Sequence, residues 1–150
     1  MTTVTVSSVI ETPLERVFEL FTDIEHGPSH VTGIKGVKLL TTHRFGLGTR
    51  WLETREVMGR LDDAEMEITA FERNRTYTIT HHKAGVKIDT LFYFEPTAGG
   101  TKVSVEFALD TGGMPPGLLT PLNWAIAGKV RDVLNHDLAD LKSAAEKVAD

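Results

Sequence analysis

The last third of the chain contains the pattern that most limits how it can fold, a long amphipathic helix. Its apolar side chains recur every three or four residues and mark one continuous face: Ile126, Val130, Val133, Leu134, Leu138, Leu141, Ala145 and Val148. A helix over residues 118–148 is about 45 Å long at 1.5 Å per residue. A helix of this length needs a broad apolar surface to lie on, and a curved sheet that holds it leaves room for a cavity between the two.

Segments in which apolar and polar residues alternate precede this helix and predict strands. We expect strands over residues 4–10, 34–40, 49–57, 65–72, 76–82, 86–95 and 101–109. Turn signals separate the last six of them, including Leu61-Asp62-Asp63 before the fourth strand. Because these connections are short, neighbouring strands are expected to pair antiparallel as a meander.

Two short helices are predicted between the first and second strands. Thr12 is the expected N-cap of the first helix, with Pro13 at the first helical position and Glu15 completing a capping box. The second helix lies within residues 23–33 and is followed by a turn. The expected fold is therefore α+β, with a curved seven-stranded antiparallel sheet, two short helices after the first strand and the long C-terminal helix over the sheet. A chain of 150 residues suits one domain, over residues 1–150.

Composition excludes several classes of function. The net charge of −5 argues against nucleic-acid binding, which requires a basic face. The chain has no cysteine, so disulfides and zinc sites of the cysteine type are excluded. No apolar run reaches the roughly 18 residues that a membrane span needs, and the alternating N-terminus lacks the basic region of a signal peptide. We therefore expect a cytoplasmic protein without membrane insertion.

Three motifs give this element order a family resemblance. They are Thr12-Pro13-x-x-Arg16-Val17-Phe18, Gly46-x-Gly48-Thr49-x-Trp51 and Gly100-Thr101-x-Val103. In this order they resemble the START-like helix-grip superfamily, which includes the birch-pollen-allergen-like (Bet v 1-like) plant proteins, and most of all its bacterial polyketide cyclase/dehydrase-like group. The resemblance implies a ligand cavity between sheet and helix. It does not choose the ligand, because one fold hosts many functions.

Strand alternation predicts which side chains line this cavity, because the apolar face of each strand must point toward the helix. The charge pattern of the third strand does not settle its orientation, and we place Trp51 inward because it has the larger area to hide. On the fourth strand this alternation also turns Ala70 inward. The predicted ligand-binding residues of the strands are Trp51, Met66, Ile68, Tyr77, Ile79, Ile88, Thr90, Phe92, Val105 and Phe107. Beyond the strands, Met114, Asn123 and Trp124 are expected to reach the same cavity.

Three polar residues share this inward face: Glu53, Arg55 and His81. With Met66, we expect Arg55 and His81 at one end of the sheet, near the start of the final helix. As a catalytic set, Arg55 would hold an anionic oxygen, His81 would move a proton near neutral pH, and Glu53 would orient His81 or act as base. Alternatively, Glu53 and Arg55 form an ordinary ion pair at the rim and His81 is a partly exposed residue at the end of a strand.

No cofactor or metal site is predicted. His26 and His30 have the i, i+4 spacing of a helical metal site, but Gly27-Pro28 lies between them and makes a regular helix there doubtful. Gly46-x-Gly48 precedes a strand instead of a helix, so it is not a phosphate-binding loop.

The expected partner is a hydrophobic or amphipathic small molecule, such as a lipid, a sterol or a polyketide-like compound, bound in the cavity. The alternatives are a polyketide cyclase/dehydratase-like enzyme that uses the same cavity, and a module that binds a protein partner. An open cavity would favour the first two functions, and a filled interior would favour the third. A monomer and a homodimer fit the sequence equally well.

Overall fold

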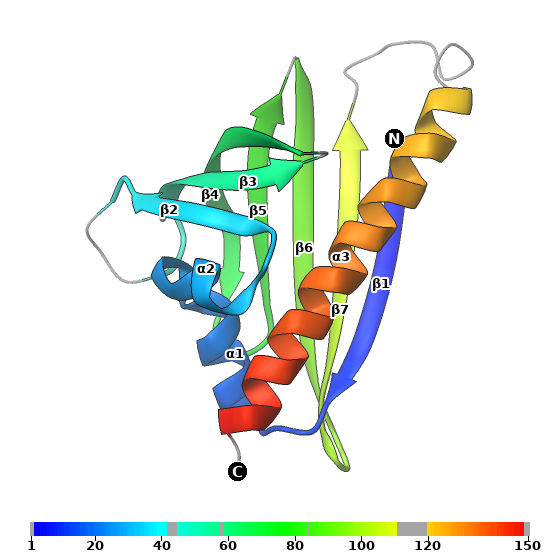
Figure 1. The fold of residues 1–150 in the computed structure, drawn as a ribbon. Coiled ribbons are helices and arrows are strands. Elements are labelled where there is room, and N and C mark those ends of the chain that lie inside the picture. Colours follow the sequence, from blue (N-terminus) through cyan, green and yellow to red (C-terminus); the bar gives the residue numbers. More distant parts are fainter. Residues whose placement is uncertain (1, 42–44, 58, 84, 111–119, 149–150) are drawn as a thin grey trace.

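The computed structural model describes residues 2–41, 45–57, 59–83, 85–110 and 120–148 (Figure 1). The side chains of residues 2, 120–127 and 148 lie outside this description. Seven strands form one antiparallel sheet in the order β1-β7-β6-β5-β4-β3-β2. The strands are β1 Thr2–Ile10, β2 Ile34–Leu39, β3 Arg50–Val57, β4 Arg60–Glu72, β5 Thr76–Lys83, β6 Val86–Thr97 and β7 Gly100–Asp110. The predicted meander is therefore confirmed from β2 to β7, and β1 joins the sheet by pairing with β7.

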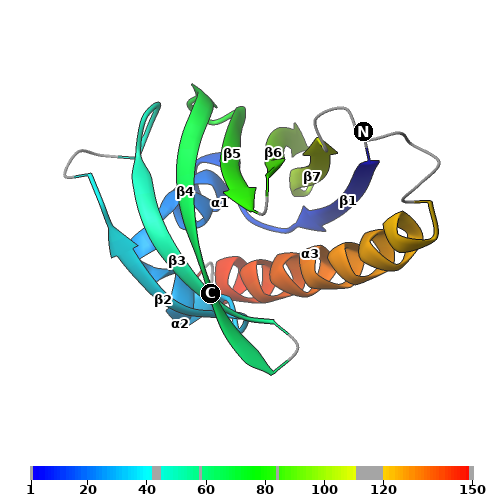
Figure 2. The ribbon, with the colours of Figure 1, turned by 90° about the horizontal axis from the view of Figure 1, so that it is seen from above.

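The helices are α1 Leu14–Thr22, the 3-10 turn η1 Ile24–His26, α2 Gly27–His30 and α3 Thr120–Val148. Figure 2 shows the sheet curving around one side of α3, so that the helix lies across its concave face. Along its length α3 packs beside β1, and it also contacts α1 and α2. The predicted long helix is thus confirmed from Thr120 onward, and the expected start at Leu118 lies outside the described residues.

Aromatic rings fill the part of the core that lies between α1 and the sheet. Phe18 on α1 packs edge-on against Phe94 with 5.1 Å between the ring centroids, and Tyr77 stacks on Phe92 at 4.6 Å. The hydroxyl of Thr101 donates a buried hydrogen bond of 2.8 Å to the carbonyl oxygen of Thr12. These contacts fix α1 against β5, β6 and β7, and they form the closed end of the space under α3.

The predicted capping box of α1 is wrong. Pro13 is the N-cap, no side chain caps the helix, and the buried Oγ1 of Thr12 has no hydrogen-bond partner among the described residues. The amides of Arg16 and Val17 both donate to the Pro13 carbonyl oxygen instead. The side chain of Thr12 is only 2% exposed and lies where β1 leads into α1.

The predicted turn at Leu61-Asp62-Asp63 is also wrong, because β4 begins earlier, at Arg60. Val57 pairs with Arg60, and Gly59 adopts a φ of +78°, which suits glycine in a tight hairpin turn. Both aspartates therefore lie in the strand. Each has a partner on a neighbouring strand, since Asp62 binds Lys83 and Asp63 accepts a hydrogen bond from Thr54.

A bulge in β4 reverses the alternation near its end. The pairing with β5 shifts between Ile68 and Ala70, so Ala70 is exposed and Phe71 turns inward. The expected inward orientation of Ala70 is therefore wrong. Phe71 instead packs against Phe18 and Phe45 and completes the aromatic part of the core.

Candidate functional site

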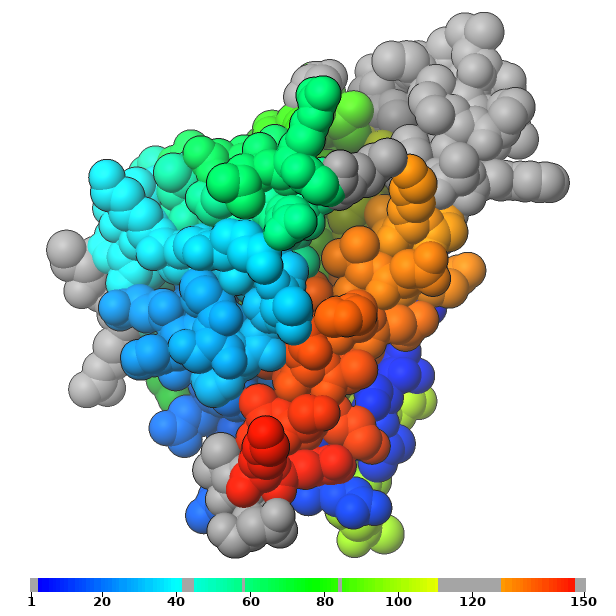
Figure 3. Space-filling view, in the orientation of Figure 1, coloured from blue at the N-terminus to red at the C-terminus, as the bar shows by residue number. Residues whose placement is uncertain are grey.

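A cavity of about 370 Å³ lies between the concave face of the sheet, α3 and the segment from α1 to β2. On the face shown in Figure 3, the blue and cyan surface of α2 and β2 adjoins the orange surface of α3. Most of the predicted wall lines the cavity: Trp51, Met66, Tyr77, Ile79, Thr90, Phe92, Val105 and Phe107. This confirms the inward orientation of Trp51 on β3.

Five predicted ligand-binding residues are placed differently. Ile68 is fully buried in the core and does not reach the cavity. Ile88 lies on β6 opposite His81, yet it is not among the residues that line the cavity. Met114 and the side chains of Asn123 and Trp124 lie outside the described residues.

Three parts of the wall were not predicted as ligand-binding residues. The strands contribute Val57, Asp62, Ala64 and Lys83. The segment from α1 to β2 contributes Leu20, Phe21, Asp23, Ile24, Gly27, His30, Val31 and Ile34. The helix contributes Lys129, Val130, Val133, Leu134, Asp137, Leu138 and Leu141. The apolar spacing of the final helix already marked most of the helical group, whereas the segment from α1 to β2 has no periodic signal because it crosses two very short helices.

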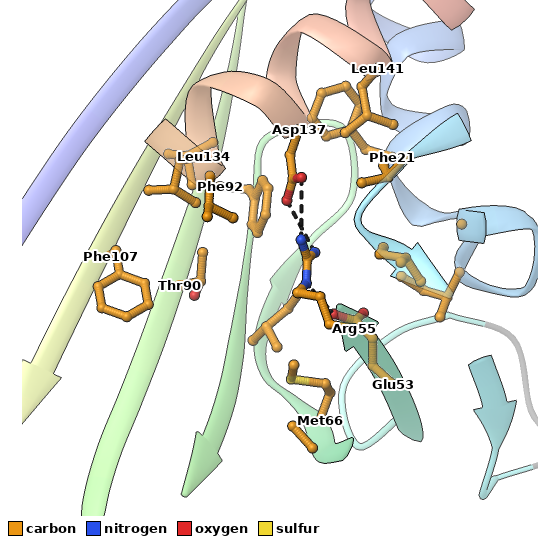
Figure 4. A pocket seen from close by; sticks show the side chains of 18 of the residues that line it. Phe21, Glu53, Arg55, Met66, Thr90, Phe92, Phe107, Leu134, Asp137 and Leu141 are labelled. Atoms are coloured by element: carbon orange, nitrogen blue, oxygen red, sulfur yellow. Dashed lines mark hydrogen bonds and ion pairs between the residues drawn. The ribbon is translucent and has the colours of Figure 1, made fainter. Parts of the chain in front are cut away.

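The polar residues of β3 meet the middle of α3 inside this cavity (Figure 4). The Arg55 guanidinium donates from Nη1 to Oδ1 of Asp137 at 3.2 Å, and its Nη2 lies 3.0 Å from Oδ2 of the same carboxylate. Its Nε donates to Oε2 of Glu53 at 3.3 Å. The other oxygen of Glu53 accepts a hydrogen bond of 3.3 Å from Nε1 of Trp51. Arg55 therefore joins the sheet to the helix through a two-bond pair with Asp137.

Asp137 is the important residue that the sequence analysis missed. It lies three residues after Leu134 and four before Leu141, so an acidic side chain occupies the apolar face of the helix. This interruption of the apolar face could have identified Asp137 as a candidate site residue.

Arg55 was expected near the start of the final helix, beside Met66, and this is wrong. Because β4 begins at Arg60, Arg55 pairs with Asp62, and Met66 pairs with Trp51.

Burial and charge act in opposite directions on the Arg55–Asp137 pair. Burial raises the pKa of the Asp137 carboxyl group, while the adjacent Arg55 guanidinium lowers it, and the result stays above the ordinary value. For Arg55, burial lowers the pKa, but the carboxylates of Asp137 and Glu53 outweigh burial and the pKa is raised. Arg55 is therefore permanently charged, and the carboxylates of Asp137 and Glu53 stabilise that charge.

His81 also lines the cavity, on β5 opposite Ile88. Its Nδ1 is buried and has no hydrogen-bond partner among the described residues. Burial lowers the pKa of His81 below its usual 6.5, against the opposing effect of the Glu53 carboxylate. The imidazole is therefore neutral at pH 7, and its Nδ1 is enclosed by protein atoms.

This pKa shift gives a stability prediction with a defined sign. Because folded His81 binds its proton less readily than the unfolded chain, its burial destabilises the fold as the pH falls through 6.5. The exposed His26 has the opposite shift, since its hydrogen bond with Asp23 raises its pKa. His81→Gln should flatten the loss of unfolding free energy between about pH 7.5 and 5.5, and His26→Gln should steepen it. Urea denaturation at several pH values measures both slopes, and an unchanged slope in His81→Gln would contradict the prediction.

Among the described residues, no group of three or more histidine, aspartate or glutamate side chains is arranged to hold a metal ion. None of the helices in the described part of the chain is both long and apolar enough to cross a membrane.

Solved structures with this fold come from several organisms. A START superfamily protein from Mycobacterium smegmatis has a TM-score of 0.79 at 16% identity, and the match covers 99% of each chain. The ginseng major latex-like protein 151 from Panax ginseng has a TM-score of 0.73 at 16% identity, covering 95% of this chain and 96% of that one. The protein TTHA0849 from Thermus thermophilus has a TM-score of 0.70 at 20% identity, covering 95% and 99%. At these identities the likeness shows the fold.

Among proteins with curated functions, none matches this sequence. A family model does match, over residues 1–146, and it describes polyketide cyclases/dehydrases and lipid transport proteins. Family and fold together indicate a START/Bet v 1-like domain of the ligand-binding or polyketide cyclase-like kind. The chain thus belongs to the polyketide cyclase/dehydrase and lipid transport family, within the START-like helix-grip superfamily.

Proposed function

We propose that this protein binds a hydrophobic or amphipathic small molecule, of the lipid, sterol or polyketide type, in the cavity between the sheet and α3. The observation that carries the proposal is the cavity itself. Its volume of about 370 Å³ lies within the range of small-molecule sites, and aromatic and aliphatic side chains make up most of its wall. A few polar groups, centred on Arg55, interrupt that wall, which suits a ligand with one polar end.

The apolar face of α3 supports this proposal. Ala145 is buried in the core, whereas Val130, Leu134 and Leu141 are only half-buried and line the cavity. The part of their apolar area that faces the cavity lacks a protein surface to cover it. A bound apolar molecule would remove that area from water, which stabilises a complex by about 25 cal/mol per Å² before the costs of binding are subtracted.

A pair of alanines on β4 provides a matched test. Ala64 lines the cavity and Ala70 is exposed on the other face of the strand. Ala64→Phe should fill part of the cavity and weaken binding of the uncharged dye N-phenyl-1-naphthylamine at least tenfold, because the added ring takes the volume that the dye needs. Ala70→Phe adds the same ring outside and should leave the affinity unchanged. Fluorescence titration measures both, after circular dichroism has established folding. Equal affinities in the two folded variants would refute binding in this cavity.

Native mass spectrometry of the purified protein, followed by organic extraction, tests the chemical class of the natural ligand. A stoichiometric lipid, sterol or polyketide-like adduct would support the proposal and identify the class. An adduct that is displaced by the dye from wild type, and is absent from Ala64→Phe, would locate it in the cavity.

A second function, cyclisation or dehydration of a polyketide, is favoured by His81. His81 lines the cavity, and a neutral imidazole there can accept a proton from a bound substrate. Glu53 is close enough to affect the pKa of His81, and Arg55 would hold Glu53 in place, since its Nε donates to Oε2 of that carboxylate. A linear poly-β-keto thioester incubated with the protein tests this function. Ring closure that is lost in His81→Gln at unchanged affinity would support it, and recovery of unaltered thioester would argue for carriage alone.

A further inference from the structure

The polar cluster in the cavity, Glu53, Arg55 and Asp137, has an excess of negative charge. Two carboxylates face one guanidinium, so the formal sum is −2 + 1 = −1. All three side chains are largely buried, with Arg55 24% exposed and Asp137 20%. Water therefore screens this charge less than it screens a surface ion pair, and any charge that enters the cavity interacts strongly with it.

The cluster also has more acceptors than donors. Its four carboxylate oxygens receive two hydrogen bonds from Arg55 and one from Trp51, together with the ion-pair contact between Nη2 of Arg55 and Oδ2 of Asp137, although each oxygen can accept two hydrogen bonds. A molecule that enters the cavity with a hydrogen-bond donor can therefore satisfy acceptors that the protein leaves open.

The other charged groups of the cavity wall lie outside this cluster and do not cancel its charge. Asp23 is hydrogen-bonded to His26, and Asp62 is paired with Lys83 from β5. Lys129 lies eight residues before Asp137 on α3, about 12 Å along the helix, and its side chain is exposed. His30 on α2 and Tyr77 on β5 complete, with His81, the set of titratable groups in the wall.

We propose that the cavity selects ligands whose buried polar group is an uncharged hydrogen-bond donor, such as an alcohol or phenol hydroxyl, and discriminates against a carboxylate on the same scaffold. This inference rests on the proposed function, since it concerns the same cavity. A hydroxyl can donate to a free lone pair of Glu53 or Asp137. A carboxylate offers only acceptors and brings a further negative charge to a cluster that already carries one.

Three naphthalenes with one differing substituent test the inference at pH 7.5. 2-Naphthol is uncharged and donates a hydrogen bond, 2-methoxynaphthalene is uncharged and cannot donate, and 2-naphthoate is an anion. We expect 2-naphthol to bind at least tenfold more tightly than 2-naphthoate, with 2-methoxynaphthalene between them. Competition against N-phenyl-1-naphthylamine gives all three dissociation constants with the same protein sample.

Two aspartate variants locate the origin of the preference. Asp137→Asn removes one negative charge but keeps an oxygen for Arg55, and it should reduce the preference for naphthol over naphthoate at least fivefold. Asp63→Asn removes the same charge from the outer face of β4, where Asp63 accepts from Thr54, and should leave the preference within twofold. Thermal unfolding of both variants controls for folding.

The outcomes separate this inference from the proposed function. If the dye itself does not bind in the cavity, both fail. If the dye binds but none of the three naphthalenes displaces it, the cavity function stands and the selectivity is wrong. If 2-methoxynaphthalene and 2-naphthoate bind as tightly as 2-naphthol, the cavity function stands and the selectivity is wrong. An equal change of preference in Asp63→Asn would also overturn the inference, because it would assign the effect to the overall charge of the protein.

Discussion

Leu138→Asp is expected to abolish folding, because Leu138 is the point at which α3 is anchored to the core. Its side chain is 3% exposed and belongs to the main hydrophobic cluster. Loss of a buried leucine costs about 2–5 kcal/mol, and an unpaired buried carboxylate adds several more. The sum approaches the total stability of a typical domain, about 5–15 kcal/mol.

Ala139→Asp is the matched control, because it introduces the same side chain at the next position, which is exposed. It should change the free energy of unfolding by no more than about 0.5 kcal/mol. Thermal unfolding followed by far-ultraviolet circular dichroism compares the two. A Leu138→Asp protein with the melting temperature of wild type would mean that this face of α3 does not dock on the sheet.

The order of elements could be predicted from the sequence because each element carries a local signal. The apolar positions of the final helix keep their spacing from Val130 to Ala145, and β7 alternates without interruption. Turns at glycine separate most of the strands. Such signals depend only on residues that are close in the sequence. They can therefore be recognised without knowing how the elements pack in the folded protein. No such local signal predicts the pairing of β1 with β7, because they are the first and the last strand along the chain.

The site was less predictable because it depends on register between strands. Placing the turn at Leu61-Asp62-Asp63 moved the expected start of the fourth strand from Arg60 to Glu65, and it put Met66, four residues beyond Asp62, beside Arg55. The alternation within each strand was unaffected, so Trp51, Glu53 and Arg55 were still correctly assigned to the inner face. An error of register moves residues along the sheet but leaves them on the same face only if the shift is an even number of residues.

The contact between Arg55 and Asp137 joins residues 82 positions apart, and no local pattern predicts such a pair. The interruption of the apolar face by Asp137 indicated that this carboxylate needed a partner, since an unpaired buried charge is costly. The identity of the partner depended on the curvature of the sheet, which brings β3 over the middle of α3 (Figures 2 and 4).

Arg55→Met should destabilise the protein by about 2–4 kcal/mol, because it leaves Asp137 and Glu53 as uncompensated carboxylates in a largely buried site. The deficit should shrink as the pH is lowered. The pKa of Asp137 is already raised in the wild type, so the folded state gains from protonation of this group, and removal of Arg55 strengthens that effect. Urea denaturation at pH 7 and at acidic pH measures both quantities. A loss of unfolding free energy under about 0.5 kcal/mol in Arg55→Met would mean that solvent, and not Arg55, screens the charges of the two carboxylates.

The triple variant Glu53→Gln/Arg55→Met/Asp137→Leu tests whether the charged cluster serves ligand recognition or the packing of α3 on the sheet. Replacement of a whole buried ion-pair network by apolar groups is often neutral for stability, so the triple variant should recover to within about 1 kcal/mol of wild type. It should bind 2-methoxynaphthalene as before but no longer prefer 2-naphthol to it. Recovered stability with lost preference would assign the cluster to ligand recognition. A triple variant that remains as unstable as Arg55→Met would assign it to the folding of α3 onto the sheet.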